Sequence, residues 1–177
     1  MSKIITVFGS SLPKVNEEEY ETAYKLGKTL ASNGFDICTG GYAGVMEAVS
    51  KGAHKKGRSV YGVTVNSLFA KPNEYLTEEI ECKDLVERIG KLVELGDAYI
   101  VLRGGTGTLV ELAMVWEMLN KSIIDSKPVV CHGSMWRPII TAMEKRIKIE
   151  KRKTGLIFVS EDIDECSQYI ISKLKTT

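Results

Sequence analysis

The chain has 177 residues, of which 44% are hydrophobic and 27% charged, a composition that suits one globular domain with a buried core. Lys and Arg together number 24 against 23 Asp and Glu, so the net charge of +1 provides no general attraction to nucleic acids or anionic membranes. No apolar run approaches the roughly 20 residues that span a bilayer, and the first residues, MSKIITVFGSS, lack the pattern of a signal peptide. We therefore expect a single cytoplasmic domain over residues 1–177, with neither a nucleic-acid nor a membrane partner.

Short β-branched runs alternate with longer segments of helical period along the whole chain, which is typical of βα units wound into a parallel sheet. Asn16 followed by Glu19 predicts a capping box for the first helix, and Gly34 predicts its end. Residues 66–83 are expected to form an irregular connection whose length favours a functional role. The expected strands are residues 4–8, 35–38, 59–65, 98–102, 128–131 and 156–159, and the expected helices are residues 17–32, 45–56, 84–95, 108–119, 135–151 and 162–174.

The cysteines and histidines give no sign of a metal site. Cys38, Cys82, Cys131 and Cys166 are widely spaced, without the close pairs of a zinc site or a compact disulfide framework, so we expect buried thiols. His54 and His132 are far apart and have no cluster of acidic residues near them. We expect neither a metal nor a cofactor.

The most informative segment runs from Asp97 to Glu111, where an expected buried strand leads directly into a glycine-rich turn and then a helix. Glycines allow the backbone to approach an oxyanion closely, and the free amides and the dipole at the start of a helix favour negative charge. The hydroxyls of Thr106 and Thr108 either donate to the same anion or cap their own helix. We expect a phosphate group to bind at Gly104, Gly105, Thr106, Gly107 and Thr108.

Two commoner phosphate-binding loops are excluded by their spacing. The chain contains no G-x-x-x-x-G-K-[ST] sequence, which excludes a P-loop NTPase. The segment from Gly105 to Val110 lacks the third glycine of the dinucleotide fingerprint. A mononucleotide or another small phosphorylated ligand fits the turn better.

Glu111 and Arg88 are the candidate functional side chains near this turn. With a helix expected to begin at Thr108, Glu111 lies in its first turn, where it either addresses a part of the ligand other than the phosphate or complements the helix dipole. Arg88 lies within one turn of the apolar stripe on the preceding expected helix. It therefore either reaches toward the site or forms a surface ion pair with Asp84.

Two further turns of small residues follow expected strands at the same edge of the sheet. One contains Gly40, Gly41 and Gly44, and the other begins with Gly9 and Ser10, followed by Ser11. Parallel sheets bind ligands at the carboxyl ends of their strands. We therefore expect Gly9, Ser10 and Gly41 to contribute to the same binding crevice as the main turn.

The segment from Arg103 to Glu111, RGGTGTLVE, resembles the P-G-G-x-G-T-x-x-E motif of the Lonely Guy family of cytokinin-activating phosphoribohydrolases, often labelled lysine-decarboxylase-like. The resemblance extends over nearly the whole chain, through Val7 to Ser11, Gly40 to Met46 and Glu87-Arg88. It implies a Rossmann-like, doubly wound α/β fold, a homodimer, and hydrolysis of a nucleoside 5′-monophosphate to free base and ribose 5-phosphate. Carried over by position, it implies that Arg88 and Glu111 are the catalytic pair and that Gly104 to Thr108 bind the phosphate.

The sequence departs from the family pattern at three positions. Arg103 replaces the proline of the motif, Ile89 stands where these enzymes usually carry lysine, and Glu47 stands where they usually carry glycine. Arg103 either adds a cation beside the bound phosphate or turns to solvent. The segment from Gly44 to Val49 is closer to a sister branch that includes molybdenum-cofactor carrier proteins. The alternative function is therefore a non-catalytic carrier or sensor of a phosphorylated ligand such as that cofactor.

The segment from Ala113 to Met118 is rich in apolar residues and bears on the expected homodimer. It forms either a seam between two copies or a buried core helix. Amino-acid decarboxylation would need a lysine that carries pyridoxal phosphate, and no lysine stands in a recognisable context for that bond.

Overall fold

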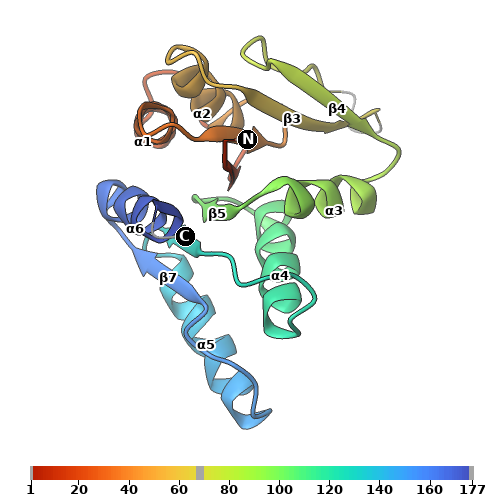
Figure 1. Cartoon of the computed structure of the whole chain (residues 1–177), viewed down its shortest axis with the longest axis vertical. Helices are drawn as coiled ribbons and strands as arrows, with labels where there is room; N and C mark the ends of the chain where they lie inside the picture. Colours follow the sequence, from red (N-terminus) through yellow and green to blue (C-terminus); the bar gives the residue numbers. More distant parts are fainter. Residues whose placement is uncertain (1, 67–69, 176–177) are drawn as a thin grey trace.

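A sheet of seven parallel strands forms the centre of the molecule, in the order β4-β3-β2-β1-β5-β6-β7 (Figure 1). The computed structural model describes residues 2–66 and 70–175. Every strand pairs in parallel with its neighbours, as is usual for a sheet built from βα units. The strands are β1 (Ile4–Phe8), β2 (Asp36–Thr39), β3 (Val60–Val65), β4 (Glu78–Cys82), β5 (Ala98–Val101), β6 (Val129–His132) and β7 (Ile157–Ser160).

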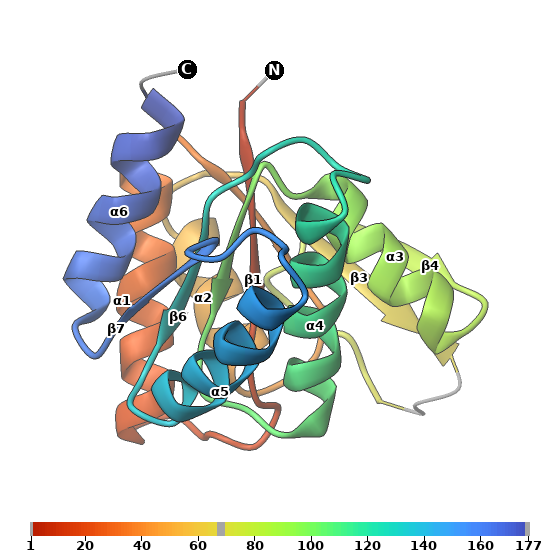
Figure 2. The ribbon, with the colours of Figure 1, turned by 90° about the horizontal axis from the view of Figure 1, so that it is seen from below.

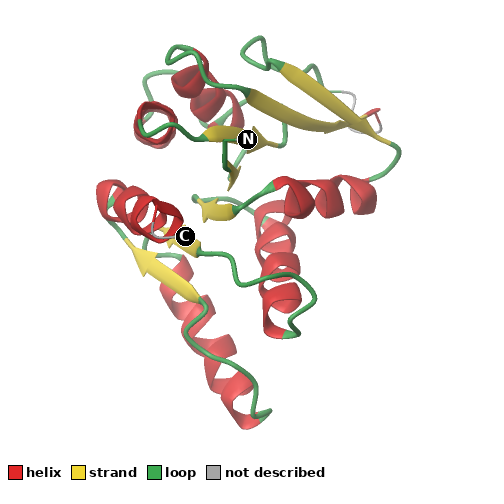
Figure 3. Ribbon diagram, viewed as in Figure 1, coloured by secondary structure: helices red, strands yellow, loops and turns green. Residues whose placement is uncertain are grey.

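In the described part of the chain, six helices cover the two faces of the sheet. Figures 2 and 3 show their arrangement. The helices α1, α2 and α6 bury one apolar core against it, and α3, α4 and α5 bury a second core against the opposite face. The inner strands are therefore apolar on both sides, which explains their continuous β-branched sequences. The helices are α1 (Glu18–Ser32), α2 (Val45–His54), α3 (Leu85–Leu95), α4 (Thr106–Asn120), α5 (Trp136–Ile149) and α6 (Ile163–Lys175).

The direction of winding reverses between β1 and β5. From β1 the chain moves outward through β2 and β3 to β4, and it then returns to β5 and moves outward on the other side. The helices that follow β1 and β5 consequently leave on opposite faces, which opens a crevice at the carboxyl ends of these two strands. The doubly wound α/β fold expected from the sequence is confirmed.

Two expectations at the start of the chain and in its middle are wrong. Asn16 does not cap α1: the cap position is Glu17, which provides no side-chain cap, and its carboxylate instead accepts from the amide of Lys14 at 2.9 Å. Residues 66–83 are not wholly irregular, because residues 78–82 form the edge strand β4. An edge strand can expose glutamates on both faces, so β4 lacks the apolar pattern that marks the inner strands. Residues 67–69 of that connection lie outside the described residues.

The helix after the main glycine turn begins at Thr106, two residues earlier than expected. We expected the turn to extend to Gly107 because glycine is a poor helix former. At the first positions of a helix the backbone amides have no intrahelical partner in any case, so a glycine is tolerated there. Glu111 therefore lies in the second turn of α4 and not in the first, and it does not complement the dipole at the helix start.

The four cysteines are buried as free thiols, as expected. Among the described residues, no helix is both long and apolar enough to cross a membrane. No group of three or more His, Cys, Asp or Glu side chains in residues 2–66 and 70–175 is placed to hold a metal ion.

Candidate active site

Three turns meet at the carboxyl edge of the sheet and are joined directly by hydrogen bonds. The amide of Ser10, after β1, donates to the carbonyl of Arg103, after β5, at 3.1 Å. The carbonyl of Ser10 accepts from the amide of Val45, the first residue of α2, at 2.9 Å. The loop after β1 is thus fixed against both glycine turns. The three turns lie together at one edge of the sheet, as expected from the sequence.

A hollow of about 410 Å³ lies between these segments, within the size range of small-ligand sites. Eight of the predicted site residues line it, and four further residues complete its wall. The predicted ones are Gly9, Ser10, Arg88, Gly105, Thr106, Gly107, Thr108 and Glu111, and the others are Ser11, Leu12, Tyr42 and Met46.

The N-terminus of α4 forms one wall of the hollow. Its cap position is Gly105, which has no side chain to occupy the free amides of the first turn. Thr106 is exposed at the first helical position, whereas Thr108 is buried with its hydroxyl against Gly104, where an added Cβ would lie 2.1 Å from Thr108 Oγ1. Neither threonine occupies the cap position, so the amides and the Thr106 hydroxyl remain available to an anion.

Arg88 forms the opposite wall and is held in one orientation by backbone carbonyls. Its Nε donates to the carbonyl of Val63 at 2.7 Å, and its Nη2 donates to that of Gly40 at 3.1 Å. Its guanidinium also lies over the ring of Tyr42, 5.5 Å from the centroid. An added Cβ at Gly40 would lie 1.9 Å from Arg88 Nη2, so only glycine at this position lets the side chain reach its partner. The expected alternative of a surface pair with Asp84 is wrong, because Arg88 is buried.

Glu111 faces Arg88 from α4. Arg88 Nη1 lies 3.6 Å from Glu111 Oε1, and the two side chains are 7% and 11% exposed. Burial raises the pKa of Glu111 to about 7, and the positive charge of Arg88 opposes that rise. At neutral pH this carboxyl group can therefore both accept and release a proton.

Tyr42 and Met46 were not predicted as site residues, although they lie next to the second glycine turn. The hydroxyl of Tyr42 donates to the carbonyl of Val65 at 2.9 Å and accepts from the Val65 amide at 2.8 Å, so the ring is fixed. The side chain of Asn73 donates to the carbonyls of Gly41 and Tyr42 at 3.0 and 3.1 Å. The structure thus places Gly41 in the support of this wall rather than in the lining. Only the proximity to a glycine turn could have indicated Tyr42.

Arg103 and Gly104 belong to the same turn but do not line the hollow. The guanidinium of Arg103 points away from it to Glu19 on α1, with Arg103 Nη1 3.6 Å from Glu19 Oε1. The side chain is 42% exposed and packs beside Gly133. In this structure Arg103 therefore supports the loop through its backbone carbonyl and leaves the α4 N-terminus without a side-chain cation.

The sequence of residues 2–165 matches the profile of the SLOG cluster4 family. The chain belongs to this family. It is 30% identical, over 150 residues, to a cytokinin riboside 5′-monophosphate phosphoribohydrolase of Rhodococcoides fascians, a match that covers 80% of this chain and 74% of that one. It is 32% identical over 135 residues to a probable enzyme of the same name from rice, covering 72% of this chain and 54% of the rice protein. The chain thus spans about half the length of that plant relative.

Solved structures share the fold over nearly the whole chain. A molybdenum cofactor binding protein from Rippkaea orientalis superposes with a TM-score of 0.77 and 22% identity, covering 98% of both chains. The molybdenum cofactor carrier protein of Chlamydomonas reinhardtii superposes with a TM-score of 0.74 and 23% identity, covering 99% of this chain and 98% of that one. At these identities the likeness establishes the fold.

Proposed function

We propose that this SLOG cluster4 protein hydrolyses the N-glycosidic bond of a nucleoside 5′-monophosphate, releasing the free base and ribose 5-phosphate. One observation carries the proposal: a buried carboxyl group with a pKa of about 7 faces a fixed arginine in the same hollow as an uncapped helix N-terminus. Relatives that are 30 and 32% identical bear the name of this activity. AMP-like nucleotides are the first candidate substrates.

The phosphate group binds at the start of α4. The free amides after Gly105 and the hydroxyl of Thr106 donate to its oxygens, and the helix dipole adds favourable potential. An acidic side chain would repel a phosphate, and the first turn of α4 contains none. Glu111, one turn further along the helix, then lies beside the ribose and not beside the phosphate.

Glu111 acts on the bond between ribose and base. As this bond breaks, its electrons leave with the base nitrogen and positive charge develops at C1′, which a carboxylate stabilises. Water adds to C1′, and Glu111 accepts the proton that the water loses. The departing base takes up a proton in turn, so water is the only reactant besides the nucleotide.

Arg88 positions the ligand and tunes this carboxylate. Because two of its donors are committed to Val63 and Gly40, only the Nη1 side faces Glu111 and the hollow. It can therefore anchor a ribose hydroxyl or a phosphate oxygen in a fixed place, and its charge maintains a population of ionised Glu111.

A chromatographic assay tests the proposal. Purified protein is incubated with AMP, GMP, CMP and UMP, and free base and ribose 5-phosphate are quantified for the wild type and for Glu111→Gln and Arg88→Ala. We expect turnover of at least one nucleotide, which both substitutions abolish. Glu117→Gln is the matched control, since Glu117 lies on the same helix but is exposed and outside the hollow. Equal turnover in Glu111→Gln would refute the assignment.

A second candidate function is that of a non-catalytic carrier of a phosphorylated ligand such as molybdenum cofactor. Its support is the end-to-end match with molybdenum cofactor binding and carrier proteins, together with Arg103, Ile89 and Glu47 at positions where the phosphoribohydrolase pattern differs. A wild-type protein that binds a nucleoside monophosphate and cleaves none would favour this function over hydrolysis.

We also propose that two copies associate through α3 and α4. The buried face of α4 contributes Leu112 and Val115 to the core, as one of the two sequence interpretations requires. Its other face exposes Leu109 and Val110, and α3 exposes Leu85 and Val86. The helices α3 and α4 lie side by side (Figure 2). Exposed apolar residues on two adjacent helices are typical of a contact between protein chains.

A further inference from the structure

The connection between β3 and β4 meets the wall of the candidate active site at Asn73. The backbone amide of Asn73 donates to the carbonyl of Gly41 at 2.8 Å, and its side-chain Nδ2 donates to the carbonyls of Gly41 and Tyr42 at 3.0 and 3.1 Å. Its Oδ1 accepts from the amide of Tyr75 at 3.1 Å, so the orientation of the carboxamide is fixed by its own segment. Both polar atoms of the side chain are thus in use.

The Gly40–Tyr42 turn, which consists of residues 40–42, has a donor on each of its three carbonyls. Arg88 Nη2 donates to the carbonyl of Gly40 at 3.1 Å, and Asn73 donates to the other two. Since consecutive peptide units are planar and share their Cα atoms, fixing two of these carbonyls restricts the direction of the third. Asn73 therefore restricts the place at which the Gly40 carbonyl meets Arg88.

Arg88 and Tyr42 are anchored to the same end of β3. The pairing of β2 with β3 ends at Gly62, whereas β3 continues to Val65, and backbone groups without a strand partner need other partners. Arg88 Nε donates to the carbonyl of Val63 at 2.7 Å, while the Tyr42 hydroxyl donates to the carbonyl of Val65 at 2.9 Å and accepts from its amide at 2.8 Å. The two side chains are thus held together, with the guanidinium 5.5 Å from the centroid of the ring.

Asn73 acts on the site indirectly. It is partly exposed and is not among the described residues that line the hollow. Its effect passes through Arg88, whose Nη1 lies 3.6 Å from Glu111 Oε1. At such a short range in a buried place, the attraction between the two charges weakens steeply when the guanidinium moves away.

We propose that Asn73 is a positioning residue: it holds the Gly40–Tyr42 turn, and through that turn it keeps the Arg88 guanidinium beside Glu111. This gives the connection between β3 and β4 a role in the site, which its length in the sequence favoured. The effect of Asn73 on turnover rests on the proposed hydrolysis. The immobilisation of Arg88 does not, and it can be measured without a substrate.

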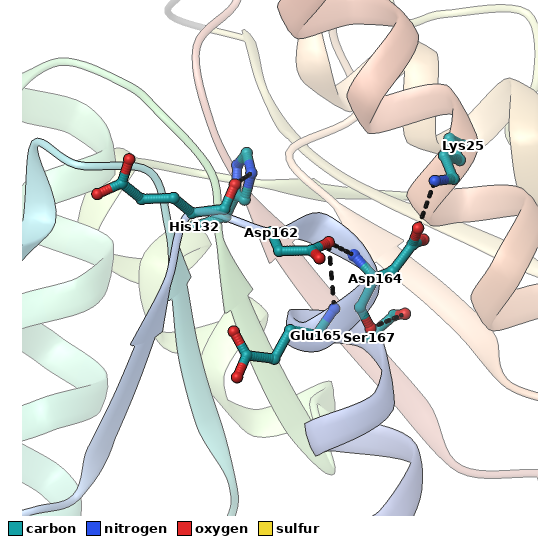
Figure 4. Close-up of polar contacts among 7 residues, drawn as sticks. Lys25, His132, Asp162, Asp164, Glu165 and Ser167 are labelled. Carbon is teal, nitrogen blue, oxygen red and sulfur yellow. Dashed lines mark hydrogen bonds and ion pairs between the residues drawn. The ribbon is translucent and has the colours of Figure 1, made fainter.

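A loop at the same edge of the sheet provides the matched control. Between β7 and α6, one carboxylate oxygen of Asp162 accepts from the amides of Asp164 and Glu165 at 2.8 and 3.4 Å, and Asp164 pairs with Lys25 of α1 at 2.6 Å (Figure 4). None of these residues lines the candidate active site. Asp162→Ala should therefore lower the stability of the protein through loss of a helix cap and leave Arg88 in place.

Exchange of the Arg88 Nε proton with solvent, measured by NMR, tests the proposal directly. The ratio of this rate to that of the Ile100 amide, in the inner strand β5, separates local loosening from a general loss of stability. Asn73→Ala should raise the ratio at least tenfold, and so should Asn73→Asp, which keeps the size of the side chain but has no donor when ionised. Asp162→Ala should leave the ratio at its wild-type value. An unchanged ratio in either Asn73 variant, or an equal rise in Asp162→Ala, would overturn the proposal.

Glu111 reports on the same displacement from the other side of the ion pair. The charge of Arg88 opposes the rise in the pKa of Glu111, and the buried Cys38 thiol nearby, whose pKa is raised to about 12, stays neutral. In Asn73→Ala the pKa of Glu111, measured by carbon NMR of its carboxyl group, should rise by about 0.5 pH units or more. If AMP is cleaved, the midpoint of the pH profile should rise equally. A wild type that cleaves no nucleotide would refute the proposed function alone, whereas an unshifted pKa of Glu111 would overturn the role of Asn73.

Discussion

The guanidinium of Arg88 and the carboxylate of Glu111 face each other at 3.6 Å in a place where water scarcely reaches either of them. The two residues come from α3 and α4, which pack on the same face of the sheet. Arg88 donates to two backbone carbonyls, whereas among the described residues only Arg88 compensates the charge of Glu111. Glu111 is therefore the energetically costly member of the pair, and its ionisation governs the behaviour of the site.

The activity should depend on pH with a midpoint near 7. Because burial raises the pKa of Glu111 to about 7, the carboxylate that accepts the water proton is lost as the pH falls below that value. We expect kcat/KM to fall about tenfold per pH unit below the midpoint. Initial rates between pH 5 and 9 measure this. The control variant Glu117→Gln should retain the profile, and a pH-independent wild type would contradict the role of Glu111.

Glu111 should also make the protein less stable at alkaline pH. The folded protein binds the Glu111 proton more tightly than the unfolded chain does, so the free energy of unfolding falls as the pH rises from about 4.5 to about 7. The loss amounts to up to about 3 kcal/mol. Glu111→Gln should therefore raise Tm at pH 8 and leave it nearly unchanged at pH 5. Equal Tm differences at both pH values would show that ionisation of Glu111 carries no such cost.

Gly40→Ala should damage the site without touching a ligand. The added Cβ would lie 1.9 Å from Arg88 Nη2 and 2.7 Å from Met46 Sδ, so the arginine must leave its carbonyl partner. We expect turnover to fall more than tenfold and Tm to decrease. Gly90→Ala, on α3 with open space around the added Cβ, is the control and should retain activity. Wild-type turnover in Gly40→Ala would show that the fixed orientation of Arg88 is unimportant.

Thr106→Val should weaken phosphate binding specifically. Removal of a hydroxyl that donates to a charged oxygen costs roughly 1.5 to 3 kcal/mol, which is about ten- to a hundredfold in affinity. Calorimetric titration with AMP measures the loss, and titration with adenosine should show none. Thr141→Val, at an exposed position on the distant α5, serves as the control. An undiminished affinity for AMP would place the phosphate elsewhere.

The assembly should be disrupted from either helix of the proposed contact. Light scattering on the wild type should give twice the 19.6 kDa of one chain, whereas Val86→Lys and Val110→Lys should give that of a single chain. Both residues are exposed and apolar on the α3 and α4 face. Ile149→Lys removes an exposed apolar residue from α5 and should leave the dimer intact. A monomeric wild type would exclude the proposed contact.

The α/β fold could be predicted from the sequence because the inner strands are largely apolar and are flanked by glycines or by the start of a helix. It did not reveal β4, whose residues Glu78 to Cys82 are acidic since an edge strand needs no apolar faces. The residue pattern alone places Arg88 only near the site, because arginine is usually a surface residue. Its place in the catalytic pair comes from the family resemblance. Its burial depends on carbonyl partners from β3 and the Gly40 turn, which are distant in sequence.

The same limit applies to the walls of the site. The glycine spacing indicated the anion-binding turn, because free backbone amides at the start of a helix depend only on residues that are close in sequence. Tyr42 and Met46 line the hollow together with residues of α3 and α4 that are distant from them in sequence. The pairing of Arg103 with Glu19 likewise joins residues that are distant in sequence, which no local pattern encodes.

The central claim is that a single hollow both holds the phosphate and breaks the glycosidic bond through Glu111. Its most direct test compares AMP binding with AMP cleavage in the wild type and in Glu111→Gln. We predict that the variant binds AMP within about threefold of the wild type while release of adenine and ribose 5-phosphate falls at least a thousandfold. Cleavage by the variant at the wild-type rate, or binding of AMP by a wild type that releases no adenine, would contradict the claim.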